Sequence, residues 1–263
     1  MQLQFKKPCT RWWAASFSSI AMSALTVTAL GALLPAQAVE FPDAGDRGAP
    51  SRTTGGGTRG EWCEDNSLWT NWNTRALVPI NNVSTFSEKQ ATLWLHVGKN
   101  FEGRVAEIYV KDAENDAFVY EQQLTIENLG EDNLVAVTLP EQAESGASLL
   151  ETGKEYLWEF SIICDANNRA NDYVVQGLFH RVEQDQSLAM SLTNATPTEQ
   201  LEQYASAGLW QEALRIAVGL KEEQPQLWSS LLASVELGEL TSNGRSVRGA
   251  SGGIGSTPPP LAN

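Results

Sequence analysis

The sequence predicts a mostly β protein, in which a β-sandwich of about seven strands over residues 61–190 is followed by a short α-helical hairpin over residues 194–240. Three observations lead to this prediction. Short runs with alternating apolar and polar residues indicate strands that are buried on one face. Clusters of Asp, Asn and Gly separate these runs, as expected for tight turns. From about residue 194 the apolar residues recur at helical spacing instead.

The clearest strand is residues 155–164. Tyr156, Trp158, Phe160, Ile162 and Cys164 share one face at a period of two, which predicts that this face is buried. The full set of expected strands covers residues 75–80, 91–97, 104–111, 117–126, 133–139, 155–164 and 173–183.

The residues before this strand indicate which kind of β-sandwich to expect. The segment from Leu150 through Gly153 to Tyr156 resembles the tyrosine corner of immunoglobulin- and fibronectin-like sandwiches, where the Tyr hydroxyl bonds to backbone a few residues upstream. Thr152 replaces the usual Pro, so the resemblance is partial, and a plain turn before a strand is the alternative.

Helix signals mark the C-terminal part. Thr196, Pro197 and Glu199 form a capping box with Pro at the first helical position. Gly208 interrupts the first apolar stripe, and Pro225 ends the second; a third helix follows and ends near residue 238.

The segment from Tyr204 to Pro225 resembles a tetratricopeptide hairpin. Gly208 at the turn, Trp210 two residues later and Ala213 three residues after that occupy the offsets of that repeat. Because one hairpin is too little to be stable alone, it must lean on the sandwich, on another copy or on a partner. An amphipathic hairpin that only caps the sandwich is the alternative.

The first 38 residues have the pattern of a signal peptide. Lys6, Lys7 and Arg11 precede an apolar stretch, and Ala36 and Ala38 supply the small residues that a signal peptidase requires. An uncleaved anchor is the alternative. Residues 39–60 read as a leader rich in Gly and Pro, and residues 241–263 as a disordered tail.

Charge and composition exclude several function classes. The formal net charge of −14 becomes −17 once residues 1–38 are removed, because they contain three basic and no acidic residues. A surface for nucleic acid needs clustered Lys and Arg, so a nucleic-acid partner is not expected. With only two His and no Cys-x-x-Cys motif, we expect no transition-metal site and no cofactor. No segment outside residues 1–38 is expected to span a membrane.

The cysteines favour a disulfide. Cleavage would remove Cys9 and leave Cys63 and Cys164, which most simply pair in an oxidising compartment. Two buried thiols are one alternative. A catalytic Cys with His96 or His180 as its base is the other, although neither His lies in a local catalytic signature.

A set of motifs spread along the chain carries a family resemblance. These motifs are Gly56-Gly-Thr-Arg-Gly60, Cys63, Ala76-Leu-Val-Pro79, Thr92-Leu-Trp-Leu95, residues 153–165, Asp172, Val175, Gly177, Arg181 and Tyr204 to Leu214. With them the chain resembles the exported domain-of-unknown-function 928 family, known mainly from cyanobacteria. Where the family often has Arg-Ser before an Asp, this chain has Arg169-Ala-Asn-Asp172. This resemblance implies a fold and a compartment but no activity.

Five tryptophans are the candidate contact residues. Trp62, Trp69 and Trp72 lie in a polar stretch, where aromatic faces beside Asn, Asp and Glu suit sugar rings; packing beside a disulfide is the favoured interpretation. Trp210 and Trp228 would provide either a surface for a protein partner or a seal between the helices and the sandwich.

Two acidic turns contain enough oxygen-bearing side chains to be considered as calcium sites. Their spacing does not match a calcium-binding loop, so ordinary turns are favoured. The oxygen-bearing residues are Asp165, Asn167, Asn168, Asn171 and Asp172 in one turn and Asp112, Glu114 and Asp116 in the other.

The sequence thus leads to one main hypothesis. The protein is expected to be an exported, non-catalytic interaction or structural module of the periplasm, cell envelope or extracellular space, with a protein partner. A carbohydrate-binding module for envelope polysaccharide is the alternative, and a hydrolase with paired carboxylates is the third reading.

Overall fold

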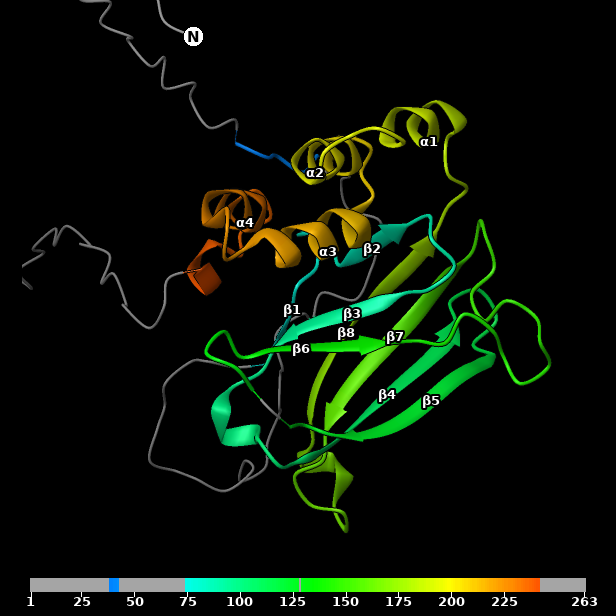
Figure 1. Cartoon of the computed structure of the whole chain (residues 1–263). Coiled ribbons are helices and arrows are strands. Elements are labelled where there is room, and N and C mark those ends of the chain that lie inside the picture. The colour runs from blue at the N-terminus through cyan, green and yellow to red at the C-terminus, as the bar shows by residue number, and fades with distance from the viewer. Residues whose placement is uncertain (1–37, 43–73, 128, 242–263) are drawn as a thin grey trace, which may run out of the picture. The chain divides into compact units, whose positions relative to one another are not determined.

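The computed structural model describes residues 38–42, 74–127 and 129–241 (Figure 1). Within these ranges the chain forms two β-sheets followed by four α-helices. The strands are β1 (Arg75–Ala76), β2 (Val83–Phe86), β3 (Thr92–His96), β4 (Val105–Asp112), β5 (Phe118–Thr125), β6 (Leu134–Thr138), β7 (Glu155–Ile162) and β8 (Tyr173–Arg181). The helices are α1 (Gln186–Leu192), α2 (Pro197–Ser206), α3 (Trp210–Leu220) and α4 (Pro225–Ala233), and short 3₁₀ turns cover Lys99–Phe101, Arg169–Asn171 and Gly238–Thr241.

The larger sheet has the strand order β2-β8-β7-β4-β5. Its central strand β7 alternates as expected, and Tyr156, Trp158 and Phe160 are each at most 2% exposed. They pack with the inward residues of the neighbouring strands, among them Ile108 and Val110. The period of two in the sequence therefore corresponds to a real core face.

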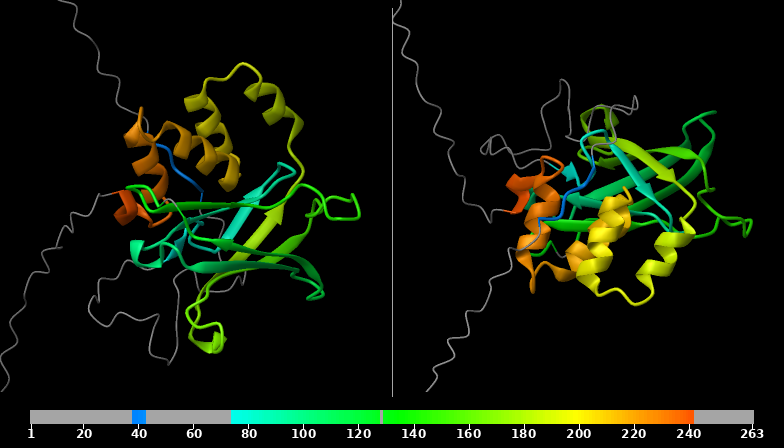
Figure 2. Two further views of the ribbon diagram at one scale, coloured as in Figure 1. Left: turned by 60° about the horizontal axis from the view of Figure 1, so that its bottom comes forward. Right: turned by 90° about the horizontal axis from the view of Figure 1, so that it is seen from above.

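The smaller sheet, β1-β3-β6, separates two hydrophobic cores. Leu93 and Leu95 of β3 belong to the core shared with the larger sheet. Trp94, between them, packs on the opposite side against the core of the helices, together with Leu77 and Leu134. The small sheet is thus the middle of three layers, with the large sheet on one side and the helices on the other (Figures 1 and 2). The predicted mostly β, sandwich-like fold with C-terminal helices is confirmed.

Each of the seven expected strand regions contains a strand, but two details differ. The region 75–80 forms only the two-residue strand β1. Strand β2 was not predicted, and it runs parallel to β8, with Val83 opposite Leu178 and Phe86 opposite Arg181. Four residues that include Ser84 and Thr85 carry too little hydrophobic alternation to be recognised from sequence.

The tyrosine-corner hydrogen bond is present. The backbone N–H of Glu151 donates to the hydroxyl oxygen of Tyr156 at 2.7 Å. Gly153, with φ of 84°, makes the turn between them, a backbone conformation that favours glycine. Burial raises the pKa of the Tyr156 hydroxyl above its ordinary value.

One glycine of β8 allows the closest packing in the large sheet. A Cβ atom added to Gly177 would lie 2.5 Å from Cζ2 of Trp158 and 3.0 Å from the carbonyl oxygen of Asn82. Trp158 is fully buried and cannot move aside. We therefore expect Gly177→Ala to lower the free energy of unfolding by about 1–3 kcal/mol, as overpacked cores do. Urea denaturation would measure this; Gly219→Ala, with open space around its Cα, is the matched control, and equal stability of both variants would contradict the packing.

The helices begin where the sequence signals place them. Thr196 and Glu199 form the capping box at the start of α2, and Pro197 occupies its first turn. Gly208, with φ of 72°, makes the turn into α3. Pro225 begins α4, whereas α3 already ends at Leu220. The helical part also starts earlier than residue 194, because residues 186–192 form α1, capped by the Asp185 side chain.

None of these helices is long and apolar enough to cross a membrane, a statement that covers the described residues alone.

Candidate functional site

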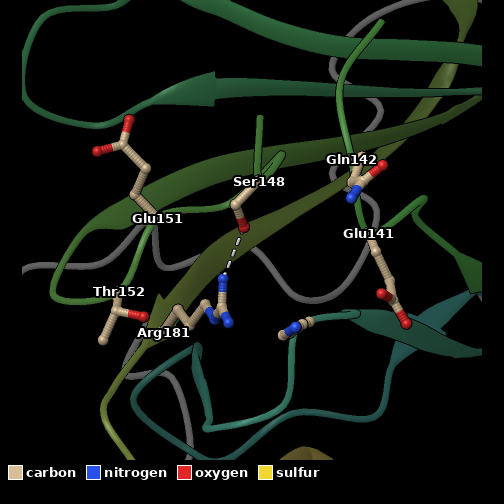
Figure 3. Close-up of a pocket in the computed structure, with 7 residues that line it drawn as sticks. Glu141, Gln142, Ser148, Glu151, Thr152 and Arg181 are labelled. Atoms are coloured by element: carbon tan, nitrogen blue, oxygen red, sulfur yellow. Dashed lines mark hydrogen bonds between the residues drawn. The ribbon is translucent and has the colours of Figure 1, made fainter. Parts of the chain in front are cut away.

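A polar pocket of about 510 Å³ opens beside the tyrosine corner (Figure 3). Most of its wall comes from the connection between β6 and β7, and Arg181 closes it from the end of β8. The lining residues are Lys89, Glu141, Gln142, Ser148, Glu151, Thr152 and Arg181.

Arg181 organises this wall. It is only 8% exposed, and its Nη1 donates to Ser148 Oγ at 2.8 Å and to the carbonyl oxygen of Leu150. Because the same short segment carries the Tyr156 hydrogen bond, Arg181 and Tyr156 together fix the loop that shapes the pocket. Lys154 pairs with Glu151 at 3.1 Å, and this contact raises the pKa of Lys154. The lining carries two basic and two acidic side chains, so the pocket suits a small polar molecule without a large net charge.

A second candidate region is the junction between α3 and the sheets. Trp210, at the start of α3, is completely buried, and its Nε1 donates to the carbonyl oxygen of Leu77 at 2.8 Å. The adjacent Gln211 accepts the backbone N–H of Thr92 at 2.8 Å. The first turn of α3 is therefore anchored to the small sheet through both polar and apolar contacts.

Glu212 extends this anchor with a buried carboxylate. Its Oε1 accepts the backbone N–H of Ser87 at 2.7 Å, the Ser87 hydroxyl at 2.8 Å and the N–H of Glu88 at 3.1 Å. Its Oε2 has no hydrogen-bond partner among the described residues. Burial raises the pKa of Glu212 despite the three donors, because the charged form has lost its water. Tyr204, Glu88 and Arg215 are the other titratable groups around it.

This raised pKa predicts a pH effect on stability. Below the ordinary carboxyl pKa, Glu212 is protonated in both the folded and the unfolded chain. As the pH rises from the ordinary carboxyl pKa towards the pKa of Glu212 in the folded chain, only the unfolded chain ionises. The free energy of unfolding therefore falls by about 1.4 kcal/mol for each pH unit between these two pKa values. We expect Glu212→Gln, which keeps the accepting oxygen, to gain stability relative to the wild type as the pH rises above the ordinary carboxyl pKa. Thermal melts at several pH values would measure the difference, with the exposed Glu222→Gln as control; a difference independent of pH would contradict it.

The third region contains a segment that precedes the sheets, residues 39–42, which we call the strap. Val39 and Phe41 are buried at 3% and 9% exposure, whereas Ala38, Glu40 and Pro42 are exposed. The Phe41 ring meets Trp210 edge to face, with centroids 4.9 Å apart. The backbone N–H groups of Val39 and Phe41 donate to Ser230 Oγ and Ser234 Oγ, both at 3.2 Å. The strap is drawn in blue beside α4 in Figure 2.

The strap belongs to the expected leader rich in Gly and Pro, residues 39–60. Two of its residues, Val39 and Phe41, are buried in the helical core. The sequence signal is the alternation of Val39 and Phe41 with exposed neighbours, which the surrounding Gly and Pro obscure. Its partners Ser230 and Ser234 are about 190 residues away, beyond any local pattern.

The predicted contact residues fall into two groups. Trp62, Cys63, Trp69 and Trp72 lie outside the described residues. Trp210 and Trp228 are described, but at 0% and 9% exposure they offer almost no surface to a protein or glycan. Of the two roles weighed for them, the structure favours the seal.

Cys164 lies two residues beyond the end of β7 and is half-buried. Its backbone N–H donates to Asp172 Oδ1 at 3.2 Å. Its pairing with Cys63 stays a prediction.

The acidic turns use their oxygens locally. Asp165 Oδ1 accepts the N–H of Asn167 at 2.8 Å, and Asp172 pairs with Arg169. Asp112 Oδ1 accepts the N–H of Glu114 at 2.9 Å in the hairpin between β4 and β5. In the part of the chain that the structure describes, no three His, Cys, Asp or Glu side chains gather as metal ligands would.

Comparison with known proteins identifies a family. A family model described as Domain of Unknown Function (DUF928) matches residues 54–244. No curated protein and no solved structure matches the chain significantly. The matched range covers more than half of the chain and includes both sheets and all four helices. The chain therefore belongs to the DUF928 family.

Proposed function

We propose that the protein is an exported, non-catalytic interaction module of the periplasm or cell envelope. The observation that supports this most is the way the strap is held. Its backbone N–H groups donate to two serine hydroxyls at α4, and its two apolar side chains enter the core of the helices. A helical face that binds an extended segment within its own chain has the chemistry needed to bind one from a partner. The resemblance of residues 204–225 to a tetratricopeptide hairpin, a repeat that stacks on neighbours, supports the same role.

Export is the second part of the proposal. The basic start, the apolar stretch and the Ala36–Ala38 pattern support cleavage after residue 38. The strap would then be the first part of the mature chain. In an oxidising compartment Cys164 would pair with Cys63. This disulfide would connect the start of the β-region to the residues directly after β7.

Crosslinking with mass spectrometry in intact cells tests the proposal. We expect the tagged full-length chain to give crosslinks to one or a few envelope proteins. A variant without residues 2–38 is the matched control, because it retains the folded part and should lose these crosslinks. Recovery of only cytosolic neighbours by the full-length chain would contradict the proposal.

The pocket in Figure 3 favours a second candidate function, binding of an envelope polysaccharide. Its lining offers both hydrogen-bond donors and acceptors, including two basic and two acidic side chains, and this mixture suits sugar hydroxyls. Calorimetry with purified envelope polysaccharide should show binding that decreases in Gln142→Ala if the pocket holds the sugar, or in Trp69→Ala if the polar tryptophan stretch does. Absence of any binding would remove this candidate.

A further inference from the structure

The strap lies against Trp210 at the start of α3 and against Ser230 and Ser234 of α4 and its C-cap. We propose that this surface, formed by Trp210, Ser230 and Ser234 and called the strap site, binds an extended segment of a protein partner. The recognised feature is an aliphatic residue followed two positions later by an aromatic residue. The chain's own strap occupies the site and must be displaced. This inference rests on the function proposed above and names the surface that carries it.

The first support is a match of spacing. Ser230 lies on α4 and Ser234 is its C-cap, four residues later, so their hydroxyls are separated by about 6 Å along the helix axis. The N–H groups of Val39 and Phe41 are two residues apart in an extended chain, a separation of about 6.7 Å. An extended chain running beside the helix can therefore reach both hydroxyls at once, as the two 3.2 Å hydrogen bonds show.

The two serines are also set up to accept. Ser230 Oγ donates to the carbonyl oxygen of Leu227 at 3.1 Å, and Ser234 Oγ donates to that of Leu231 at 2.7 Å. Each hydroxyl proton is thus used within the helix, which leaves the oxygen lone pairs for an incoming N–H. Since every residue except Pro has a backbone N–H, this part of the recognition does not depend on sequence.

The side chains supply the specificity. Val39 and Phe41 enter the helical core, and the Phe41 ring packs edge to face on Trp210. Glu40, between them, is exposed, so the residue at this position of a partner segment is not restricted. A buried aromatic anchor with an aliphatic residue two positions before it is the chemistry that a partner segment must reproduce.

The covalent connection makes the strap a competitor. Tethering holds a segment near its site at an effective concentration on the order of millimolar. A free segment of the same sequence displaces the strap only when its concentration exceeds this effective concentration. The wild-type site therefore binds only a partner segment that has a higher affinity or a high local concentration. Weakening the strap should therefore uncover the site.

Fluorescence anisotropy with a labelled peptide of residues 38–42 tests the proposal on the complete mature chain. We expect the peptide to bind a Phe41→Ala chain at least tenfold more tightly than the wild type, because the mutated strap competes less. Adding Ser230→Ala and Ser234→Ala to that chain should weaken binding about tenfold through loss of the two acceptors. A peptide with Ala in place of its Phe should not bind. Equal binding to the wild-type and Phe41→Ala chains, or no effect of the serine substitutions, would overturn the proposal.

A second measurement does not depend on the folding of Phe41→Ala. In an otherwise wild-type chain, Ser230→Ala and Ser234→Ala keep α4 helical because Ala is a strong helix former. Hydrogen exchange should then accelerate about tenfold at the Phe41 N–H, which donates to Ser234 Oγ, while α4 stays protected. Unchanged exchange in the strap would show that the serines do not hold it, and the proposal would fail.

The outcomes separate this inference from the proposed function. Crosslinks to envelope proteins without peptide binding would overturn the strap site alone. Peptide binding without any crosslinked partner would overturn the proposed function and, with it, the partner as occupant. Dimers of the Phe41→Ala chain with wild-type chains at the peptide-binding concentrations would make a second copy the occupant and would also overturn the proposal.

Discussion

Trp210→Ala should destabilise the protein more than any other single change within its helices. The variant removes a completely buried ring that contacts Phe41, and it leaves the carbonyl oxygen of Leu77 without its donor. Truncations of buried aromatic residues cost about 3–5 kcal/mol, which lowers the melting temperature of a chain this size by about 10 °C. Thermal unfolding followed by circular dichroism would measure the change.

Trp210→Phe separates the two contributions of this side chain. It keeps most of the ring but loses the Nε1 donor, so we expect an intermediate loss of about 1–3 kcal/mol. Both variants should still unfold in one transition, because α3 is anchored to the sheets by Trp210, Gln211 and Glu212. A separate early melting of helical signal, with the β signal unchanged, would show that the helices form an independent domain.

Loss of the predicted disulfide should have an effect of similar size. Cys63 and Cys164 enclose about a hundred residues, and in the chain-entropy model a bridge over such a loop stabilises by about 4.7 kcal/mol. We expect Cys164→Ser to lower the free energy of unfolding by about 2–5 kcal/mol relative to the oxidised wild type. Urea denaturation would measure it.

The matched control is the partner cysteine. If the two residues form one bridge, Cys63→Ser and the double variant should be destabilised as much as Cys164→Ser, because the bridge can be lost only once. Independent, additive effects of the two substitutions would contradict the pairing. A wild-type stability that does not change on reduction would contradict it as well.

The main strands were predictable because their signal is local. The residues of β7 alternate between half-buried and buried from Glu155 to Phe160, and the capping box of α2 lies within four residues, so both were recognised from the chain itself. Strand β2 and helix α1 are four and seven residues long, and neither has enough apolar residues for a clear period.

The candidate sites depend on contacts that no local pattern contains. Trp210 reads as an anchor in the sequence, but only its hydrogen bond to Leu77, 133 residues away, shows that it faces inward. The buried carboxylate of Glu212 occupies a helix position that sequence alone would assign to solvent, and its donors come from a loop about 125 residues away. Burial of polar groups is decided by tertiary packing, which explains why the strap, the pocket and this carboxylate could not be predicted.

The most direct test of the account is the intact mass of the protein purified from the exported fraction of cells, measured before and after reduction. We expect a chain that begins at Val39, in which the oxidised form carries one bridge between Cys63 and Cys164 and lacks free thiols. The strap would then be the mature N-terminus of a clasped, exported molecule. A chain that keeps residues 1–38 and remains in the cytosol with both cysteines reduced would contradict the account.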